Sequence, residues 1–195
     1  ESFDELMEAY KKQLLASMHQ VIDLICDYHT LRGKYLPVPY LSILMNGPME
    51  KGTDTKDGGQ FYAVTTFNGV GIATVADALA AVKKIVFDEK KATMEEVVEG
   101  CLTNWEGKED LRQMFIAAPK FGNDDDYVDL LARDVSLQTT TTFRSFKNIW
   151  GGPFLEDGTG AASYYAYSGL TGATPDGRKD RDMFCDGPVS PAVGT

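Results

Sequence analysis

The sequence predicts a helix-rich α/β fold. Apolar residues recur at three- and four-residue steps in several long segments, which is the pattern of amphipathic helices. Two shorter segments, 60–67 and 159–169, are β-rich or alternating and are typical of strands. The composition, with 43% hydrophobic and 25% charged residues, is that of a globular protein. We therefore expect an ordered chain of helices and strands, with helices in the majority.

The first expected helix begins at Ser2 and ends near Gly33. Ser2 followed by Glu5 is a capping box, in which the hydroxyl and the carboxylate satisfy free amides at a helix start. Apolar residues then keep helical spacing over many turns. Beyond this helix, two prolines favour an extended entry to a short apolar helix-like turn, which Gly47 and Pro48 close.

Further helices are expected over residues 71–90, 93–105, 108–118 and 127–146. The first of these is rich in alanine and carries lysines toward its end. A second capping box, formed by Thr93 and Glu96, marks the start of the next. Pro119 stops the third, and a run of β-branched residues from Thr139 lowers the helix propensity of the last.

Charge and hydropathy exclude several classes of function. The net charge is −10 at pH 7, and the sequence has no cluster of basic residues that would bind nucleic acid. An anionic membrane would repel a protein of this charge. Apolar runs are short and interrupted by charge, so no membrane span is predicted. The N-terminal residues lack the core of a signal peptide. We expect a cytoplasmic protein.

The three cysteines, Cys26, Cys101 and Cys185, are far apart in the sequence. There is no C-x-x-C pair and no neighbouring histidine pair, so neither a disulfide framework nor a zinc site is predicted. Isolated thiols fit a reducing compartment. Cys26 and Cys101 are expected to be small core residues, while Cys185 stands in a loop-like segment.

Three consecutive aspartates stand in the segment APKFGNDDDYVD, directly before the helix expected over residues 127–146. Asn123 or Asp124 stands where an N-cap belongs, and Asp125 and Asp126 would oppose the positive end of the helix dipole. A metal site would need carboxylates that converge from different segments, because adjacent side chains rarely face one ion. The helix start is therefore the favoured interpretation.

Other motifs of enzyme chemistry are weak or absent from the sequence. The segment GVGIAT lacks the third glycine and the acidic partner of a dinucleotide site, and there is no Walker loop or G-x-S-x-G elbow. His19 and His29 both fall in the first helix with no identifiable catalytic partner. The segment TPDGRKD predicts a tight turn, in which Pro175 fixes φ, Asp176 bonds the backbone and Gly177 permits a positive φ.

Five segments in order carry a family resemblance: GGQFYAV, ATVADALAAVKKIVFDEK, APKFGNDDDYVD, TGATPDGRK and DGPVSPAVGT. Together they resemble the pyruvate formate-lyase-like glycyl radical enzymes over essentially the whole chain. Members of that family are several times longer. The match is to the segment between the catalytic cysteine loop and the C-terminal glycyl radical domain. Residues 1–195 are therefore expected to be an internal segment of the barrel domain and not an independent domain.

The resemblance implies part of a ten-stranded α/β barrel, built from two five-stranded halves and wrapped in helices. One loop at its centre carries a cysteine whose thiyl radical abstracts hydrogen from substrate, and the other carries the glycine that stores the radical. Neither loop motif occurs here, so no catalytic residue and no metal site is assigned to this segment. The resemblance implies that the protein binds no cofactor and that a radical SAM iron-sulfur activating enzyme installs its glycyl radical. It also implies that the protein works under anaerobic conditions and forms a homodimer. A bacterial microcompartment is the alternative to the free cytoplasm.

The resemblance also implies roles for particular residues. Thr159, Ala161 and Ser163 would line the substrate, and Arg178 would either anchor a substrate carboxylate or form a buried ion pair. Small residues at the first two positions, where diol dehydratases tend to carry bulky ones, favour a substrate larger than glycerol. Ala63 replaces the usual asparagine of a G-G-x-x-Y-N pattern. The structural motif residues are Asn123, Asp124, Asp125, Gly172, Pro175, Asp176 and Gly177.

The expected activity is that of a lyase or dehydratase that breaks a C–O, C–N, C–S or C–C bond of a small organic substrate after thiyl hydrogen abstraction. It requires the rest of the same protein chain. One alternative is an X-succinate synthase that adds a hydrocarbon to fumarate, which the small residues at 159 and 161 would favour. Another is a non-catalytic split subunit or scaffold that lacks both radical loops.

Overall fold

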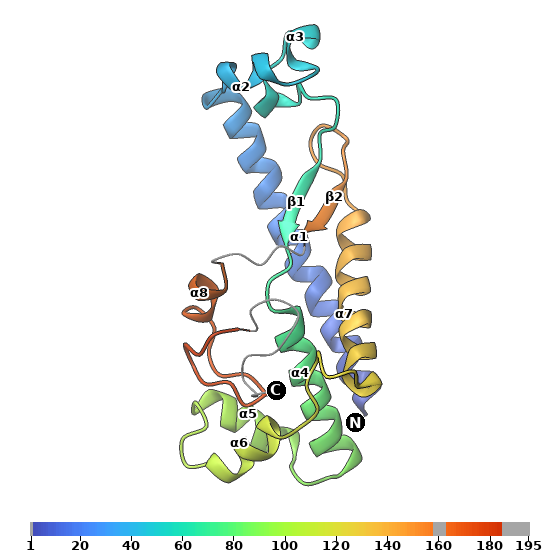
Figure 1. Ribbon diagram of the computed structural model, residues 1–195, viewed down its shortest axis with the longest axis vertical. Coiled ribbons are helices and arrows are strands. Elements are labelled where there is room, and N and C mark those ends of the chain that lie inside the picture. Colours follow the sequence, from blue (N-terminus) through green and yellow to red (C-terminus); the bar gives the residue numbers. More distant parts are fainter. Residues whose placement is uncertain (1, 158–162, 185–195) are drawn as a thin grey trace. The chain divides into compact units, whose positions relative to one another are not determined.

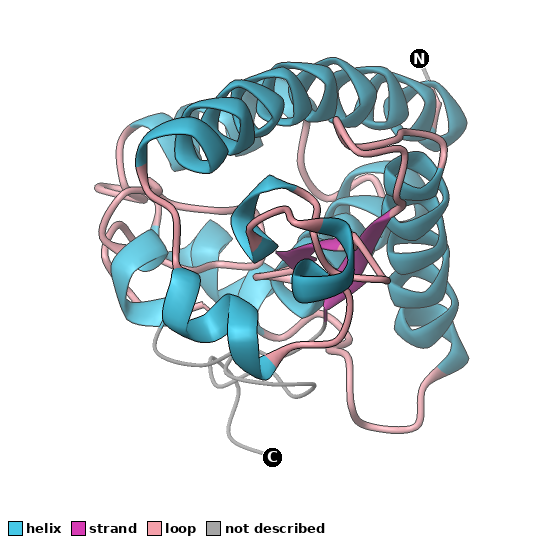
Figure 2. Cartoon of the chain, turned by 90° about the horizontal axis from the view of Figure 1, so that it is seen from above, coloured by secondary structure: helices cyan, strands magenta, loops and turns pink. Residues whose placement is uncertain are grey.

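The computed structural model describes residues 2–157 and 163–184 (Figure 1). Helices make up most of the described elements, and only two short strands accompany them in this part of the chain (Figure 2). The chain divides into two compact units, which are described separately below. Unit 1 comprises Glu1–Leu6, Asn68–Leu137 and Gly158–Thr195, and unit 2 comprises Met7–Phe67 and Gln138–Asp157.

The elements, in chain order, are α1 (Phe3–Tyr35), α2 (Pro39–Leu44), α3 (Pro48–Lys51), the 3₁₀ turn η1 (Thr55–Asp57), β1 (Thr65–Asn68), α4 (Ile72–Val82), the π-helical segment η2 (Lys83–Asp88), α5 (Met94–Leu102), α6 (Glu109–Ile116), α7 (Asp126–Arg144), β2 (Phe154–Asp157) and α8 (Ser163–Ser168). Every segment expected to be helical contains a helix, and both predicted capping boxes are formed. No helix in the described residues has the length and apolar character needed to cross a membrane.

The larger core of unit 1 lies under α5 and α6. Trp105 and Phe115 are fully buried there, with ring centroids 5.5 Å apart. Gly100 passes directly beneath the indole, where an added Cβ would lie 2.7 Å from Trp105 Cε3, so only glycine fits. The buried members of this core are Ala81, Val82, Ile85, Ala92, Val97, Trp105, Phe115 and Ala118.

A second core of unit 1 joins α4 to α7. Its buried residues are mostly alanines, which let two helix backbones approach closely: Ala76, Ala80, Val128 and Ala132. Next to it, the Tyr127 hydroxyl donates to Asp88 over 2.7 Å, and the Lys83 ammonium lies 4.2 Å from the centre of the Tyr127 ring. The small residues of the Ala-rich segment therefore serve helix packing as well as helix propensity.

Unit 2 is built around aromatic and aliphatic side chains of α1, α7 and the strands. Its buried centre consists of Met18, Ile22, Phe143 and Phe154. Phe67 stacks on Phe143 with ring centroids 4.6 Å apart and an interplanar angle of 14°. Strands β1 and β2 pair side by side and run in the same direction (Figure 1). A two-stranded sheet is marginal alone, so this core is what stabilises the pair.

Asn148 ties the entry of β1 to the turn before β2. Its Nδ2 donates to the Ala63 carbonyl over 2.6 Å and to Thr65 Oγ1 over 3.1 Å. Its Oδ1 accepts from the amides of Trp150 and Gly152. One buried side chain thus satisfies backbone groups on both sides, as a buried amide must.

Several boundaries differ from the sequence predictions. The strand expected over 60–67 is confined to Thr65–Asn68, and β2 was not predicted because Gly-Gly-Pro precedes it and it has only four residues. The helix expected over 93–105 ends at Leu102, because Asn104 and Trp105 adopt positive φ values of 55° and 61°. The helix expected over 71–90 changes to π-helix at Lys83.

The strand predicted over residues 159–169 is wrong in its described part, because α8 occupies Ser163–Ser168. Alternating small and tyrosine residues are compatible with either element over so short a span, and local periodicity could not decide between them. Leu170 N and the Thr171 hydroxyl both donate to the Tyr167 carbonyl, at 3.0 and 3.1 Å, and satisfy it as α8 ends.

Candidate functional site

The loop from Thr171 to Asp182 in unit 1 contains the TPDGR segment. The Gly177 amide donates to the Thr174 carbonyl over 3.1 Å, and the Thr174 amide donates to the Arg178 carbonyl over 3.0 Å. Gly177 has a φ of 93°, a conformation that other residues adopt only with strain. The tight turn predicted from the sequence is therefore present, with glycine at the position that requires it.

Arg178 is buried at the centre of this loop, with 2% of its surface exposed. Its Nη2 donates to the carbonyls of Thr171, over 3.0 Å, and Gly172. Its Nη1 donates to the Asp182 carbonyl over 2.6 Å, and Nε donates to Thr174 Oγ1 over 3.1 Å. Four of the five guanidinium N–H groups are thus used inside the loop. These acceptors are neutral, so in the described residues the side chain braces the loop through three carbonyls and one hydroxyl and not through an ion pair.

Two polar side chains outside the loop hold it against the α5–α6 region. Arg112 of α6 donates from Nε to the Gly177 carbonyl over 2.7 Å. Asn104 accepts a hydrogen bond from the Asp180 amide, also over 2.7 Å. Sequence reasoning missed Arg112 and Asn104, because no local pattern links residues so far apart in the chain.

Lys120 is a buried cation in the same unit, with 4% of its surface exposed. Its ammonium donates to the carbonyls of Phe115, over 2.8 Å, and Ala118, over 3.1 Å. Burial lowers the pKa of Lys120, while the carboxylates of Asp77 and Asp176 act in the opposite direction and favour the charged form. Lys120 belongs to the APKFGNDDDYVD segment, but no local pattern in that segment predicts that this lysine would be buried.

The aspartates after Lys120 begin α7, with a different cap from the one predicted. Asp125 is the residue whose side chain caps the helix, since its Oδ1 accepts from the Tyr127 amide over 2.9 Å. Asp124 has a φ of 56°, outside the extended conformation of an N-cap, and Asn123 bonds back to the Lys120 carbonyl over 3.2 Å. The N-cap prediction at Asn123 or Asp124 is therefore corrected to Asp125.

The same segment is fixed to α4 by Asp77, which is completely buried. Its Oδ1 accepts from the Phe121 amide over 2.7 Å. Within residues 2–157 and 163–184, no group of three or more histidine, cysteine, aspartate or glutamate side chains is arranged to hold a metal ion. The described carboxylates that this segment gathers serve backbone amides and the buried lysine.

The residues expected to line the substrate are only partly within the described chain. Thr159 and Ala161 lie outside the described residues. Ser163 is the first residue of α8, and Arg178 follows ten residues after the end of that helix. Their proposed contacts with substrate stay predictions.

Neither described cysteine has the environment of an activated thiol. Burial, with a further contribution from the Asp176 carboxylate, raises the pKa of Cys101 to about 11. Burial also raises the pKa of Cys26. Both thiols are half-buried beside apolar side chains, so they are protonated at neutral pH and serve packing. Cys185 lies outside the described residues.

The two histidines of α1 pack against aromatic rings in unit 2. His19 meets Phe146 edge-on with ring centroids 4.7 Å apart, and His29 meets Trp150 at 5.0 Å. Burial lowers the pKa of His29. These contacts give both imidazoles a packing role in unit 2.

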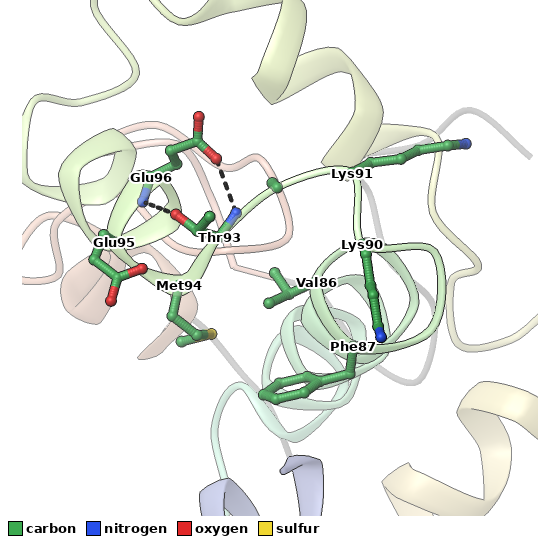
Figure 3. Close-up of a pocket in the computed structure, with 9 residues that line it drawn as sticks. Val86, Phe87, Lys90, Lys91, Thr93, Met94, Glu95 and Glu96 are labelled. Atoms are coloured by element: carbon green, nitrogen blue, oxygen red, sulfur yellow. Dashed lines mark hydrogen bonds between the residues drawn. The ribbon is translucent and has the colours of Figure 1, made fainter. Parts of the chain in front are cut away.

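A hollow of about 500 Å³ opens in unit 1 where η2 leads into α5 (Figure 3). Its wall includes the Thr93 and Glu96 capping box, whose amides and acceptors already bond each other. None of the residues predicted to bind substrate lines it. The lining residues are Val86, Phe87, Lys90, Lys91, Ala92, Thr93, Met94, Glu95 and Glu96. We do not assign the reaction to this hollow.

Comparison with known proteins gives consistent matches. Residues 1–167 match the family model described as pyruvate formate lyase-like. The chain is 32% identical to trans-4-hydroxy-L-proline dehydratase of Clostridioides difficile over 99% of its own length and 24% of that protein. It is 38% identical to isethionate sulfite-lyase of Nitratidesulfovibrio vulgaris over 62% of its length and 15% of that protein.

Solved structures agree with the sequence matches. The B12-independent glycerol dehydratase of Clostridium butyricum, in its glycerol-bound form, superposes with a TM-score of 0.89 and 36% identity. This match covers 95% of the chain and 24% of that structure. The chain therefore spans about a quarter of the length of the full-length relatives that it matches.

Proposed function

Because the chain belongs to the pyruvate formate lyase-like family, we propose that it forms part of a glycyl radical lyase or dehydratase. The observation that carries the proposal is the 32% identity over 99% of the chain with a hydroxyproline dehydratase, joined to the TM-score of 0.89 with a glycerol dehydratase. Several of the similar proteins are dehydratases or sulfite-lyases by name. The reaction is cleavage of a C–O, C–N, C–S or C–C bond in a small organic molecule.

The chemistry requires parts of the protein beyond these residues. A thiyl radical would abstract hydrogen from a C–H bond too strong for acid–base removal, and its cysteine and the radical-storing glycine would both belong to other segments of the same protein. Residues 1–195 would form an internal part of the barrel domain, which keeps water and oxygen from the intermediate. We propose no bound cofactor, an activating radical SAM iron-sulfur enzyme as partner, a homodimer, and an anaerobic cytoplasm or microcompartment as its setting.

Within this segment, we propose that Thr159, Ala161 and Ser163 line the substrate. Small side chains at the first two positions leave room for a molecule larger than glycerol. Arg178 is the weaker candidate for direct contact, because four of its five N–H groups bond the loop that contains it. Because its guanidinium already bonds the loop, Arg178 is better suited to holding the loop in place.

The first test is the intact denatured mass of the natural protein, purified anaerobically. A mass about fourfold above 21.4 kDa is expected, since the chain covers 24% of its full-length relatives. The protein would then be activated and examined by EPR for a glycyl radical. Candidate substrates would include hydroxyproline, isethionate, 1,2-diols and larger hydroxylated compounds, with product identified by mass spectrometry.

Radical formation together with turnover of a hydroxylated, aminated or sulfonated substrate is the expected result. A radical-bearing protein that instead joins a hydrocarbon to fumarate would replace the lyase assignment with a synthase. A natural protein of 21.4 kDa without a radical would contradict the enzymatic proposal and favour a non-catalytic subunit.

A further inference from the structure

A continuous chain of hydrogen bonds connects helix α8 to the buried guanidinium of Arg178. The Thr171 hydroxyl donates to the Tyr167 carbonyl in α8 over 3.1 Å. The carbonyl of the same Thr171 accepts from Arg178 Nη2 over 3.0 Å. Thr171 is thus bonded to the helix through its side chain and to Arg178 through its backbone, so a displacement of the guanidinium would be transmitted to the end of α8.

The other contacts of Arg178 make it a fixed point. Its remaining donors reach Gly172, Thr174 and Asp182, so one planar group binds both ends of the loop. A lysine at this position offers a single ammonium, which cannot reproduce that spread of donors. The guanidinium of Arg178 is buried away from solvent. A buried carbonyl that loses its hydrogen-bond donor destabilises the fold considerably more than an exposed one.

The loop is in turn fixed to a rigid part of unit 1. Arg112 of α6 bonds the Gly177 carbonyl, and the Gly177 Cα packs so closely on Ile116 that an added Cβ would lie 2.5 Å from Ile116 Cγ1. Helix α6 carries Phe115, which is completely buried in the core of unit 1. The position of α8 is therefore set from the core through α6, the loop, Arg178 and Thr171.

We propose that Arg178 is a positioning residue for the reaction, which sets the placement of α8 and hence of Ser163, the first residue of that helix. This inference rests on the proposed function, because it needs Ser163, the first residue of α8, to contact substrate. It assigns Arg178 no contact with substrate. The consequence is that substrate affinity depends on a side chain that the substrate does not touch.

The first arm of the test measures hydrogen exchange in the full-length protein and requires no activity. Arg178→Lys is compared with Arg181→Lys, the same substitution in the same loop at an exposed residue whose Nε lies 3.9 Å from the Asp180 carboxylate. Arg178→Lys should speed exchange in α8, residues 163–168, by about tenfold, because local opening becomes easier. Arg181→Lys should leave it within about twofold of the wild type. Faster exchange confined to residues 174–182, or no change, would overturn the proposal.

A second pair of variants isolates the link through Thr171 and remains informative if Arg178→Lys fails to fold. Thr171→Val removes the hydroxyl that donates to Tyr167 and keeps the side-chain shape, whereas Thr171→Ser keeps the hydroxyl. Faster exchange in α8 for the valine variant alone supports the linkage. Equal exchange in both variants contradicts it.

The kinetic arm separates positioning from a merely structural role. In Arg178→Lys, KM should rise about tenfold while kcat and the EPR-detected radical content stay within about twofold, because the loss falls on substrate placement. An unchanged KM, or a loss of radical content with KM unaltered, would overturn the positioning role. A wild-type protein without radical or turnover would refute the proposed function itself, and the exchange measurements would still decide whether Arg178 places α8.

Discussion

Arg112 Nε donates to the Gly177 carbonyl across 2.7 Å, between residues 65 positions apart in the chain. The bond closes unit 1, because it joins α6 to the loop that follows α8. Its donor is charged and its acceptor belongs to a glycine with a positive φ, so both the length and the direction of the bond depend on the backbone conformation at Gly177. This dependence gives the first prediction.

Gly177→Ala should destabilise the loop by about 2 kcal/mol or more, because the new Cβ meets Ile116 as well as a positive φ. Gly107→Ala is the matched control, since Gly107 also has a positive φ, 72°, but its Cβ would meet nothing within 4 Å. Exchange protection in the full-length protein measures the difference, over residues 171–182 for Gly177→Ala and around residue 107 for the control. Equal loss in the two variants, each at its own site, would show that strain alone matters and that packing on Ile116 does not.

Lys120→Met should cost about 3 kcal/mol, because it removes the ammonium donor to the Phe115 and Ala118 carbonyls and the cation beside Asp77 and Asp176. Lys91→Met, which breaks an exposed ion pair with Glu89, should leave the stability nearly unchanged, because solvent screens such a pair. The two variants are compared as full-length proteins, first by thermal unfolding and then by hydrogen exchange within residues 115–121. A Lys120→Met protein as stable as Lys91→Met would mean that apolar packing replaces the buried ammonium without loss.

Cys101 should resist alkylation at pH 8 and become reactive only as the pH approaches 11, because the thiolate is the nucleophile. Asp176→Asn keeps an oxygen acceptor and removes the charge, so it should lower the pKa of Cys101 and speed its alkylation near pH 9.5. Peptide mass spectrometry after timed iodoacetamide treatment resolves the site. Alkylation of native Cys101 at pH 8 at the rate of the unfolded chain would contradict the burial.

The same shift predicts the direction of a stability change with pH. The Cys101 pKa is about 11 in the folded protein and near its ordinary value of 9.0 when unfolded. Above pH 9 the unfolded state loses its proton first, so this thiol's contribution is fully present below pH 9 and declines as the pH rises toward 11. A Cys101→Ala variant should show a shallower decline over that range, and an identical slope would count against the shift.

The isolated segment should associate or precipitate. Within unit 2, Tyr40, Leu44, Met49 and Tyr62 expose between 67% and 87% of their surface, an unusual concentration of large apolar side chains. Light scattering after size exclusion of residues 1–195 measures the association. Replacing Leu44 and Tyr62 by glutamine should reduce it, and a monodisperse monomer of the unaltered segment would contradict the prediction.

Sequence and tertiary structure contributed differently to the candidate site. The turn at Thr174–Gly177 follows from local chemistry, since proline, aspartate and glycine each act on their own backbone. The partners of that turn do not. Arg112 and Asn104 have no distinguishing local pattern. The sequence left Arg178 either a substrate carboxylate or a buried ion pair, and only the structure shows that its acceptors are in the loop itself.

By itself, the sequence determined the helices, both capping boxes and the family, because apolar spacing, caps and ordered motifs are properties of contiguous residues. Tertiary structure alone decided that 163–168 is helical, that Asp125 and not its neighbours caps α7, and that Lys120 is buried. Each of those outcomes depends on a bond or contact with a group elsewhere or on the backbone conformation reached on folding. Short, polar or glycine-rich segments have too weak a local conformational preference to determine such contacts or backbone conformations from sequence.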